Sequence, residues 1–209
     1  MPRRCLLLLL SLCAPLMALW AQQGFTVSAI PDSVFARMQG RSFPQECTVK
    51  RADLRYLQVL HYDAEGTVHT GELVCNKLIA NDLLYIFKQL YEARYPIERM
   101  RLIDDYDADD ERSMADNNTS CFCFRAISGS KKLSKHAQGL AIDINPLYNP
   151  CVKGQTVQPA CARKYADRTQ KHPYTISRGD RLWQLFTQRG FGWGGSWRSL
   201  KDYQHFEQR

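Results

Sequence analysis

Two stretches of alternating apolar and polar residues open the regular part of the chain. The segment LRYLQVLHYD at residues 54–63 and the segment TVHTGELVC at residues 67–75 both alternate in the manner of half-buried strands. The link between them is three residues long and ends in Gly66, which can adopt the positive φ that tight turns require. The pattern predicts a β-hairpin.

The spacing of apolar residues then changes to the period of a helix. In residues 81–96 they recur every three or four positions until a proline ends the pattern, which predicts an amphipathic helix packed on the hairpin. A second helix is predicted at residues 177–190, with Ser177 and Asp180 placed as a capping box and Gly190 as its stop.

Three shorter apolar segments, at residues 100–105, 120–127 and 139–145, have the composition of further strands. Strands and helices of this number and order indicate an α+β fold, with a small antiparallel sheet and flanking helices. No linker or repeat divides the chain, so residues 22–209 are expected to form a single domain.

The segment SKHAQGLAIDINP at residues 134–146 is a candidate site. In an extended strand Ile142 and Ile144 point to one side, whereas Ala141 and Asp143 point to the other. The second side carries small side chains next to one carboxylate, which leaves an open surface, here called the floor, where a metal ion and a substrate could bind. His136 lies on the loop that enters this strand and can fold back over that floor.

Two ligands do not complete a zinc site, so a third is required elsewhere. His61 and His69 lie within the predicted hairpin strands, and His172 precedes a proline in a polar loop. His205 is the favoured candidate, because acidic residues lie three positions before it and two positions after it in a segment rich in glycine and aromatic residues.

These residues resemble a motif of zinc peptidases. The family is that of the D-alanyl-D-alanine carboxypeptidases and L-alanyl-D-glutamate peptidases, which includes VanX- and VanY-like enzymes and shares its fold with the Hedgehog signalling domain. The resemblance extends from about Leu54 to the C-terminus. Its motif residues in this chain are Ser134, His136, Gly139, Ala141 and Asp143, followed by Asp202, His205 and Phe206.

The resemblance implies that His136, Asp143 and His205 bind Zn²⁺ and that Asp202 is the general base. Spacing alone favours Glu207, which shares a face with His205 in a straight strand. Asp202 can reach the metal only if the chain turns near residues 203–204. Asp202 is preferred as the base, and Glu207 remains the alternative.

The resemblance also implies a cation that stabilises the developing oxyanion. Arg125 is the first candidate and Arg112 the second, although a plain salt bridge to the nearby acidic residues accounts equally well for Arg125. Ser134 either binds substrate or caps the loop, and substrate binding is preferred.

The acidic run at residues 104–116 has some of the spacing of a calcium-binding loop. Asp110 nevertheless occupies the position of the required glycine, and Asp116 replaces the bidentate glutamate. A solvated acidic loop at the rim of the cleft is the preferred interpretation.

The N-terminus has the features of a signal peptide at residues 1–21. Two arginines precede an apolar run that is shorter than the roughly 20 residues needed to span a bilayer, and small residues follow it. This predicts a bacterial protein that is periplasmic or secreted, with no transmembrane span once the signal is removed.

The net charge of the chain is +7, and removing residues 1–21 lowers it to +5 because Arg3 and Arg4 are lost with no acidic residue. No basic run interleaved with aromatic residues occurs, so the sequence does not indicate a nucleic-acid partner. We expect a monomer.

Six cysteines follow the predicted signal peptide, and an even number in an exported chain favours disulfides. Cys151 and Cys161 form the best candidate bridge, because they flank a short loop with a proline at each end and a glycine inside. The sequence does not show how the other four pair, namely Cys47, Cys75, Cys121 and Cys123.

The sequence therefore predicts an exported zinc metallopeptidase acting on peptidoglycan stem peptides, either at a D-Ala-containing end or at L-Ala-D-Glu. Two alternatives belong to other classes. One is a zinc-stabilised module that binds cell wall without cutting it, and the other is a disulfide-stapled interaction protein without metal.

Overall fold

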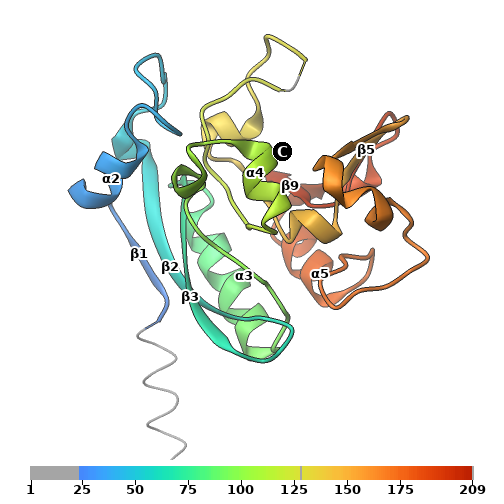
Figure 1. The fold of residues 1–209 in the computed structure, drawn as a ribbon. Helices are drawn as coiled ribbons and strands as arrows, with labels where there is room; N and C mark the ends of the chain where they lie inside the picture. The colour runs from blue at the N-terminus through green and yellow to red at the C-terminus, as the bar shows by residue number, and fades with distance from the viewer. Residues whose placement is uncertain (1–23, 128, 209) are drawn as a thin grey trace, which may run out of the picture.

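The protein contains three small antiparallel sheets with helices packed between and around them (Figure 1). A computed structural model describes residues 24–127 and 129–208. The predicted signal peptide lies outside the described residues. The predicted α+β class is confirmed.

The first sheet has the order β1-β2-β3, with β1 at Thr26–Ser28, β2 at Leu54–Tyr62 and β3 at Val68–Asn76. β2 and β3 pair antiparallel over their whole length, which confirms the predicted hairpin. Gly66 in the turn has a φ of 82°, as expected for a glycine in this link.

The helix α3 at Ala80–Glu92 lies along the first sheet, as Figure 1 shows. It ends four residues before the predicted boundary at Pro96. Arg94 adopts a left-handed φ of 52°, which the helix cannot continue through. A shorter helix, α2 at Asp32–Met38, packs near the same sheet.

The second sheet contains two of the three candidate metal ligands. Its order is β4-β9-β7, with β4 at Ala141–Asp143, β9 at His205–Gln208 and β7 at Phe191–Trp193. The helix α5 at Arg181–Gln188 packs against β7 and α3. It is the second predicted helix.

The start of α5 differs in detail from the predicted capping box. Asp180 is the cap residue itself, and its carboxylate accepts hydrogen bonds from the Trp183 N–H and the Ser177 N–H, each at 2.7 Å. Gly190 has a φ of 83° just beyond the helix, which agrees with its predicted role as a stop.

The third sheet has the order β6-β5-β8, with β5 at Cys151–Lys153, β6 at Thr156–Gln158 and β8 at Lys201–Asp202. The remaining elements are short. They are α4 at Asp110–Ala115 and the 3₁₀ turns η1 at Arg51–Asp53, η2 at Ile103–Tyr106, η3 at Lys135–Gln138, η4 at Pro146–Tyr148, η5 at Ala160–Ala166 and η6 at Gly194–Ser196.

Two predicted strands are wrong. Residues 100–105 run into the 3₁₀ turn η2, and residues 120–127 form isolated bridges rather than a ladder. In the second segment Ser120 pairs with Asp143, whereas Phe122 donates its N–H to the Val74 carbonyl. The segment changes partner from one sheet to the next, so no continuous strand forms.

The main core joins the first and second sheets through α3 and α5. Phe206 on β9 is fully buried and stacks against Phe186 of α5 with ring centroids 4.5 Å apart. Ile142 and Ile144 are also fully buried in this core, as the alternation around β4 predicts.

The predicted disulfide between Cys151 and Cys161 is not formed, and both are free thiols. Cys151 lies on β5 directly opposite Asp202, and burial together with that neighbouring carboxyl group raises the pKa of the thiol. Cys161 is exposed in η5, beyond the β5–β6 hairpin. The other four cysteines of the described residues are free as well.

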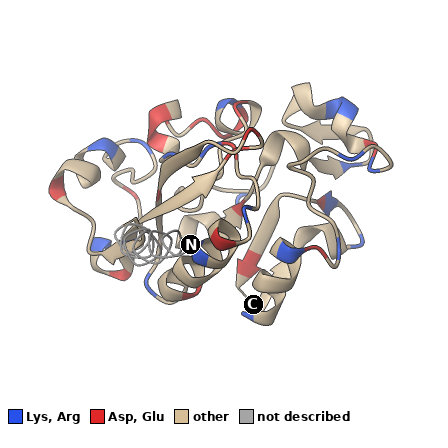
Figure 2. Ribbon diagram, turned by 90° about the horizontal axis from the view of Figure 1, so that it is seen from below, with Lys and Arg blue, Asp and Glu red and all other residues tan. Residues whose placement is uncertain are grey.

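Basic and acidic residues are interspersed over the described part of the ribbon (Figure 2). Within residues 24–127 and 129–208, no helix combines the length and the apolar character that crossing a membrane requires.

Candidate metal and catalytic site

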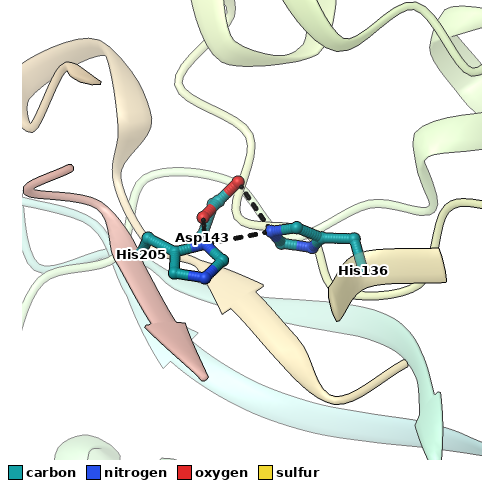
Figure 3. A group of neighbouring side chains, drawn as sticks. All are labelled: His136, Asp143 and His205. Carbon is teal, nitrogen blue, oxygen red and sulfur yellow. Dashed lines mark hydrogen bonds and ion pairs between the residues drawn. The ribbon is translucent and has the colours of Figure 1, made fainter. Parts of the chain in front are cut away.

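His136, Asp143 and His205 converge on one point, from η3, β4 and β9 respectively (Figure 3). The His136 Nε2 atom lies 3.2 Å from the His205 Nδ1 atom. The two Asp143 oxygens lie 3.0 Å from His205 Nδ1 and 3.2 Å from His136 Nε2. All three side chains are buried.

The local backbone explains how the three side chains meet. Asp143 and His205 are directly opposite each other in the antiparallel β4–β9 pair, so they share one face of the sheet. His136 is brought over that face by η3, which ends at Gly139 with a left-handed φ of 66°. A Cβ atom on Gly139 would lie 2.7 Å from the Asn76 backbone nitrogen, so only glycine allows this approach.

Hydrogen bonds on the outer sides of both imidazoles fix their tautomers. His136 Nδ1 lies 2.6 Å from the Cys121 carbonyl oxygen, which can only accept, so Nδ1 is protonated. His205 Nε2 lies 3.2 Å from the Glu207 carboxylate and donates to it in the same way. The inner nitrogens, His136 Nε2 and His205 Nδ1, therefore present lone pairs to each other when the rings are neutral.

Two lone pairs and a carboxylate at such short distances repel one another unless a cation lies between them. The set of two imidazoles and one carboxylate, each held by an outer hydrogen bond or a strand, suits a divalent metal ion. The described residues therefore fit a metal site with three protein ligands.

The metal-free electrostatics lead to the same conclusion. Burial opposes a charge on His205, but hydrogen bonds to Asp143 and Glu207 outweigh it and raise the pKa of His205 to about 10. Burial alone would raise the pKa of Asp143, whereas ion pairing with His136 and His205 holds it well below its usual range. The cluster favours positive charge at its centre.

Asp202 lies at the end of β8, and the chain bends at residues 203–204 before β9 begins. This is the turn that Asp202 needs to approach the metal ligands. Its Oδ1 atom is buried and has no hydrogen-bond partner among the described residues. Burial raises the pKa of Asp202 to about 6, and the nearby Asp143 acts in the same direction.

Glu207 is on the outer side of His205, two residues along the straight strand β9. Its hydrogen bond to His205 lowers the pKa of Glu207, and its side chain is 27% exposed. This position suits a residue that orients His205.

Of the two candidate arginines, Arg125 lies near the cluster. Its Nη2 atom lies 2.5 Å from Asp110 Oδ2. Burial lowers the pKa of Arg125, but the charges of Asp110 and Asp143 outweigh this and raise it above its ordinary value. Arg112 instead pairs with Asp107 at 3.1 Å and is 59% exposed.

Ser134 caps η3, and its Oγ atom accepts a hydrogen bond from the His136 N–H at 3.2 Å. The hydroxyl proton is not used in this bond, so a role in substrate binding stays a prediction. Trp197 was not singled out as a site residue, yet its ring centroid lies 5.3 Å from that of His205.

The other histidines have separate partners. His61 Nδ1 lies 2.7 Å from the Ile97 carbonyl oxygen, and His69 Nε2 lies 2.7 Å from Asp63. His172 stacks on Tyr148 with ring centroids 3.9 Å apart.

The acidic run at residues 104–116 is an ordered segment rather than a freely solvated loop. Asp104 accepts hydrogen bonds from Ser42, Asp109 caps α4, and Asp116 bonds to Tyr106 and Arg99. These carboxylates do not converge on a common point, and the only metal-like cluster among the described residues is that of the two histidines and Asp143.

Two contacts could not be predicted from the sequence. The Cys121 carbonyl that fixes His136 is a backbone group, which no residue type marks. Asp110 stands in an acidic run, and only its pairing with Arg125 distinguishes it from its neighbours. A separate cavity of about 360 Å³ on the first sheet is lined by none of the three candidate ligands; its walls include Tyr56, Glu72, Met100 and Arg101.

The comparisons with known proteins point to one family. Residues 128–208 match the family described as D-alanyl-D-alanine carboxypeptidase. The matched segment contains the three candidate ligands and Asp202, whereas Arg125 precedes it. No curated protein and no solved structure was found to match the chain.

Proposed function

From the premise that residues 128–208 match the family described as D-alanyl-D-alanine carboxypeptidase, we propose that the protein is an exported zinc metallopeptidase acting on peptidoglycan stem peptides. The bond cleaved is either the peptide bond before a terminal D-Ala or the peptide bond between L-Ala and D-Glu. The observation that carries the proposal is the set of inward-facing lone pairs on His136 and His205 beside Asp143. Export rests on the signal-peptide features of residues 1–21.

The residues that would hold zinc are His136 through Nε2, His205 through Nδ1 and Asp143 through its carboxylate. Zinc with three protein ligands and an open position supplies Lewis-acid activation of a water molecule and of the scissile carbonyl. The Cys121 carbonyl and Glu207 fix the two imidazole rings so that little reorganisation is needed on binding.

Asp202 is proposed as the general base. With a pKa of about 6 its carboxylate is mostly ionised at neutral pH, yet it is basic enough to take a proton from the attacking water. The protonated Asp202 then returns this proton to the leaving amine. Glu207 is less suited to this role because its carboxylate is engaged by His205.

Arg125 is proposed to stabilise the negative charge that develops on the scissile carbonyl oxygen. Its side chain is 26% exposed, and a fixed charge in a site partly shielded from water stabilises a transition state more than it would in water. Ser134 is proposed to donate its hydroxyl proton to the substrate.

Asp202 also separates this function from that of a non-catalytic zinc-stabilised module that binds cell wall. Structural zinc sites are closed by four protein ligands. The present cluster offers three among the described residues, with a carboxyl oxygen nearby that is buried and unpartnered. A site that only stabilises the fold gains nothing from that arrangement.

Digestion of purified peptidoglycan by the protein without residues 1–21 tests the proposal. We expect new peptide termini in the mass spectrum, either free D-Ala or a new D-Glu amino terminus. The matched control is Asp202→Ala, which should bind zinc and release these termini about 10² to 10⁴ times more slowly than the wild type. Stoichiometric zinc in a wild type that releases no new terminus would favour the binding module.

A further inference from the structure

Asp110 and Arg125 form an ion pair next to the metal cluster. Arg125 Nη2 lies 2.5 Å from Asp110 Oδ2, and the two side chains are 26% and 32% exposed respectively. They come from different elements, since Asp110 opens α4 and Arg125 lies in the segment that leads to η3. The pair thus joins α4 to the chain that carries the first metal ligand.

The electrostatic surroundings place the pair beside the ligands. Burial raises the pKa of Asp110, and the charges that act on this carboxylate include His136 and Asp143 as well as Arg125. The backbone is tied to the same place, because the Ser134 N–H donates to the Arg125 carbonyl at 3.1 Å.

Arg125 has donors left over after this pairing. Its Nε atom is buried and has no hydrogen-bond partner among the residues that the structure describes. A buried guanidinium donor without an acceptor is costly, and a bound substrate oxygen is one acceptor that would satisfy it.

A freely exposed salt bridge does not explain this geometry. Exposed pairs contribute little because both side chains remain solvated and mobile. Here Asp110 is held at the start of α4 by the cap residue Asp109, whose carboxylate accepts from the Arg112 N–H at 3.0 Å. Asp110 therefore presents a fixed acceptor to the Arg125 guanidinium.

We propose that Asp110 is a positioning residue, which holds the Arg125 guanidinium so that its remaining N–H groups face the scissile carbonyl oxygen of the substrate. The inference rests on the proposed function. It assigns to the acidic α4 segment a task in the reaction, although Asp110 itself does not touch the substrate.

A double-mutant cycle with Asp110→Asn and Arg125→Gln tests the inference. Alone, Arg125→Gln should lower kcat by about 10² to 10³, the usual loss for one oxyanion donor. Asp110→Asn alone should lower kcat by about 10- to 100-fold, the usual loss for an outer positioning group, with KM nearly unchanged. In the Arg125→Gln background, Asp110→Asn should cost less than about 3-fold, because residues that act as a unit are not additive.

The matched control is Asp107→Asn. Asp107 pairs with Arg112 and Arg41 on the exposed side of the same acidic run, at 3.1 and 3.4 Å, so its removal breaks comparable ion pairs away from the cluster. It should change kcat by less than about 2-fold, as expected for exposed pairs. An equal loss in both backgrounds of the cycle would show that Asp110 acts independently of Arg125 and would overturn the inference.

A second measurement does not depend on activity. The Nε–H signal of Arg125, identified by its absence in Arg125→Gln, should exchange slowly with solvent in the wild type and at least about 10-fold faster in Asp110→Asn, because a freed side chain reaches water. Unchanged exchange would overturn the positioning role. If the wild type cleaves no stem peptide but the exchange rates differ as expected, the proposed reaction fails while the positioning of Arg125 stands.

Discussion

Asp202 and Glu207 flank His205 in sequence, and the proposal assigns proton transfer to Asp202 and the orientation of His205 to Glu207. Asp202→Ala should keep zinc, because His136, Asp143 and His205 remain, and should lower turnover by about 10² to 10⁴, the usual contribution of a positioned acid or base. Glu207→Gln should cost about 10- to 100-fold, since it weakens only the orientation of His205. Steady-state kinetics with zinc analysis of each variant checks this order. An inactive Glu207→Gln beside an active Asp202→Ala would identify Glu207 as the base.

The raised pKa of Asp202 sets the expected pH dependence. Because its pKa is about 6 in the metal-free protein, the carboxyl group is protonated below that value and cannot act as a base. Activity should therefore fall as the pH decreases through about 6, or through a lower value once a bound dication favours the ionised form. A kcat profile between pH 4 and 8 measures this limb. If the residual activity of Asp202→Asn shows the same fall at low pH, the fall is caused by the titration of another group.

At the level of single residues, the sequence identified the side chains better than their surroundings. His136, Asp143 and His205 could be found because metal-ligating side chains are rare and their spacing resembles a known motif. The Cys121 carbonyl could not be found, because a backbone group carries no residue signature. The short loop with its prolines and glycine favours a Cys151–Cys161 bridge, but this local pattern does not show that Cys151 lies opposite Asp202.

At the level of elements, Gly139 connects the turn that carries His136 to the strand that carries Asp143. Gly139→Ala should lower the free energy of unfolding by more than about 1 kcal/mol, because the left-handed φ disfavours alanine and the new Cβ meets the Asn76 nitrogen. Zinc affinity should fall with it as η3 shifts. Urea denaturation and zinc titration measure the two effects.

Gly154 provides the control for this substitution. It also has a left-handed φ, 57°, but a Cβ there would meet nothing within 4 Å. Gly154→Ala should therefore show the conformational cost without the clash and without loss of zinc affinity. Equal effects of the two substitutions would mean that the contact with Asn76 yields easily.

The length of an element decided whether the sequence could predict it. The hairpin β2–β3 and the helices α3 and α5 are long enough for a period of two or of 3.6 residues to stand out. Residues 120–127 have the composition of a strand, yet Ser120 bonds to β4 while Phe122 bonds to β3. Composition favours an extended chain, but it does not show whether one neighbouring strand pairs with that chain along its length.

At the level of the whole molecule, the site lies where separate parts of the fold meet. The candidate ligands come from η3, β4 and β9, and His136 is 69 residues from His205 along the chain. On one side of the site, β9 is held in place by the packing of Phe206 on Phe186. On the other side, η3 is held in place by the close packing of Gly139 on β3. Unfolding of either side would separate the candidate ligands.

Metal binding should therefore stabilise the whole domain. The unfolded chain does not hold the three ligands together, so zinc binds the native state and adds about 2.7 kcal/mol when its free concentration is 100 times the dissociation constant. Removing zinc with a chelator should lower the melting temperature, and adding back one equivalent per chain should restore it. In His136→Ala or His205→Ala, which should lose stoichiometric zinc, the chelator should have no effect. Near-stoichiometric zinc in the variant that carries both substitutions would place the metal elsewhere. A wild type whose melting temperature changes with neither chelator nor added zinc would contradict the metal site itself.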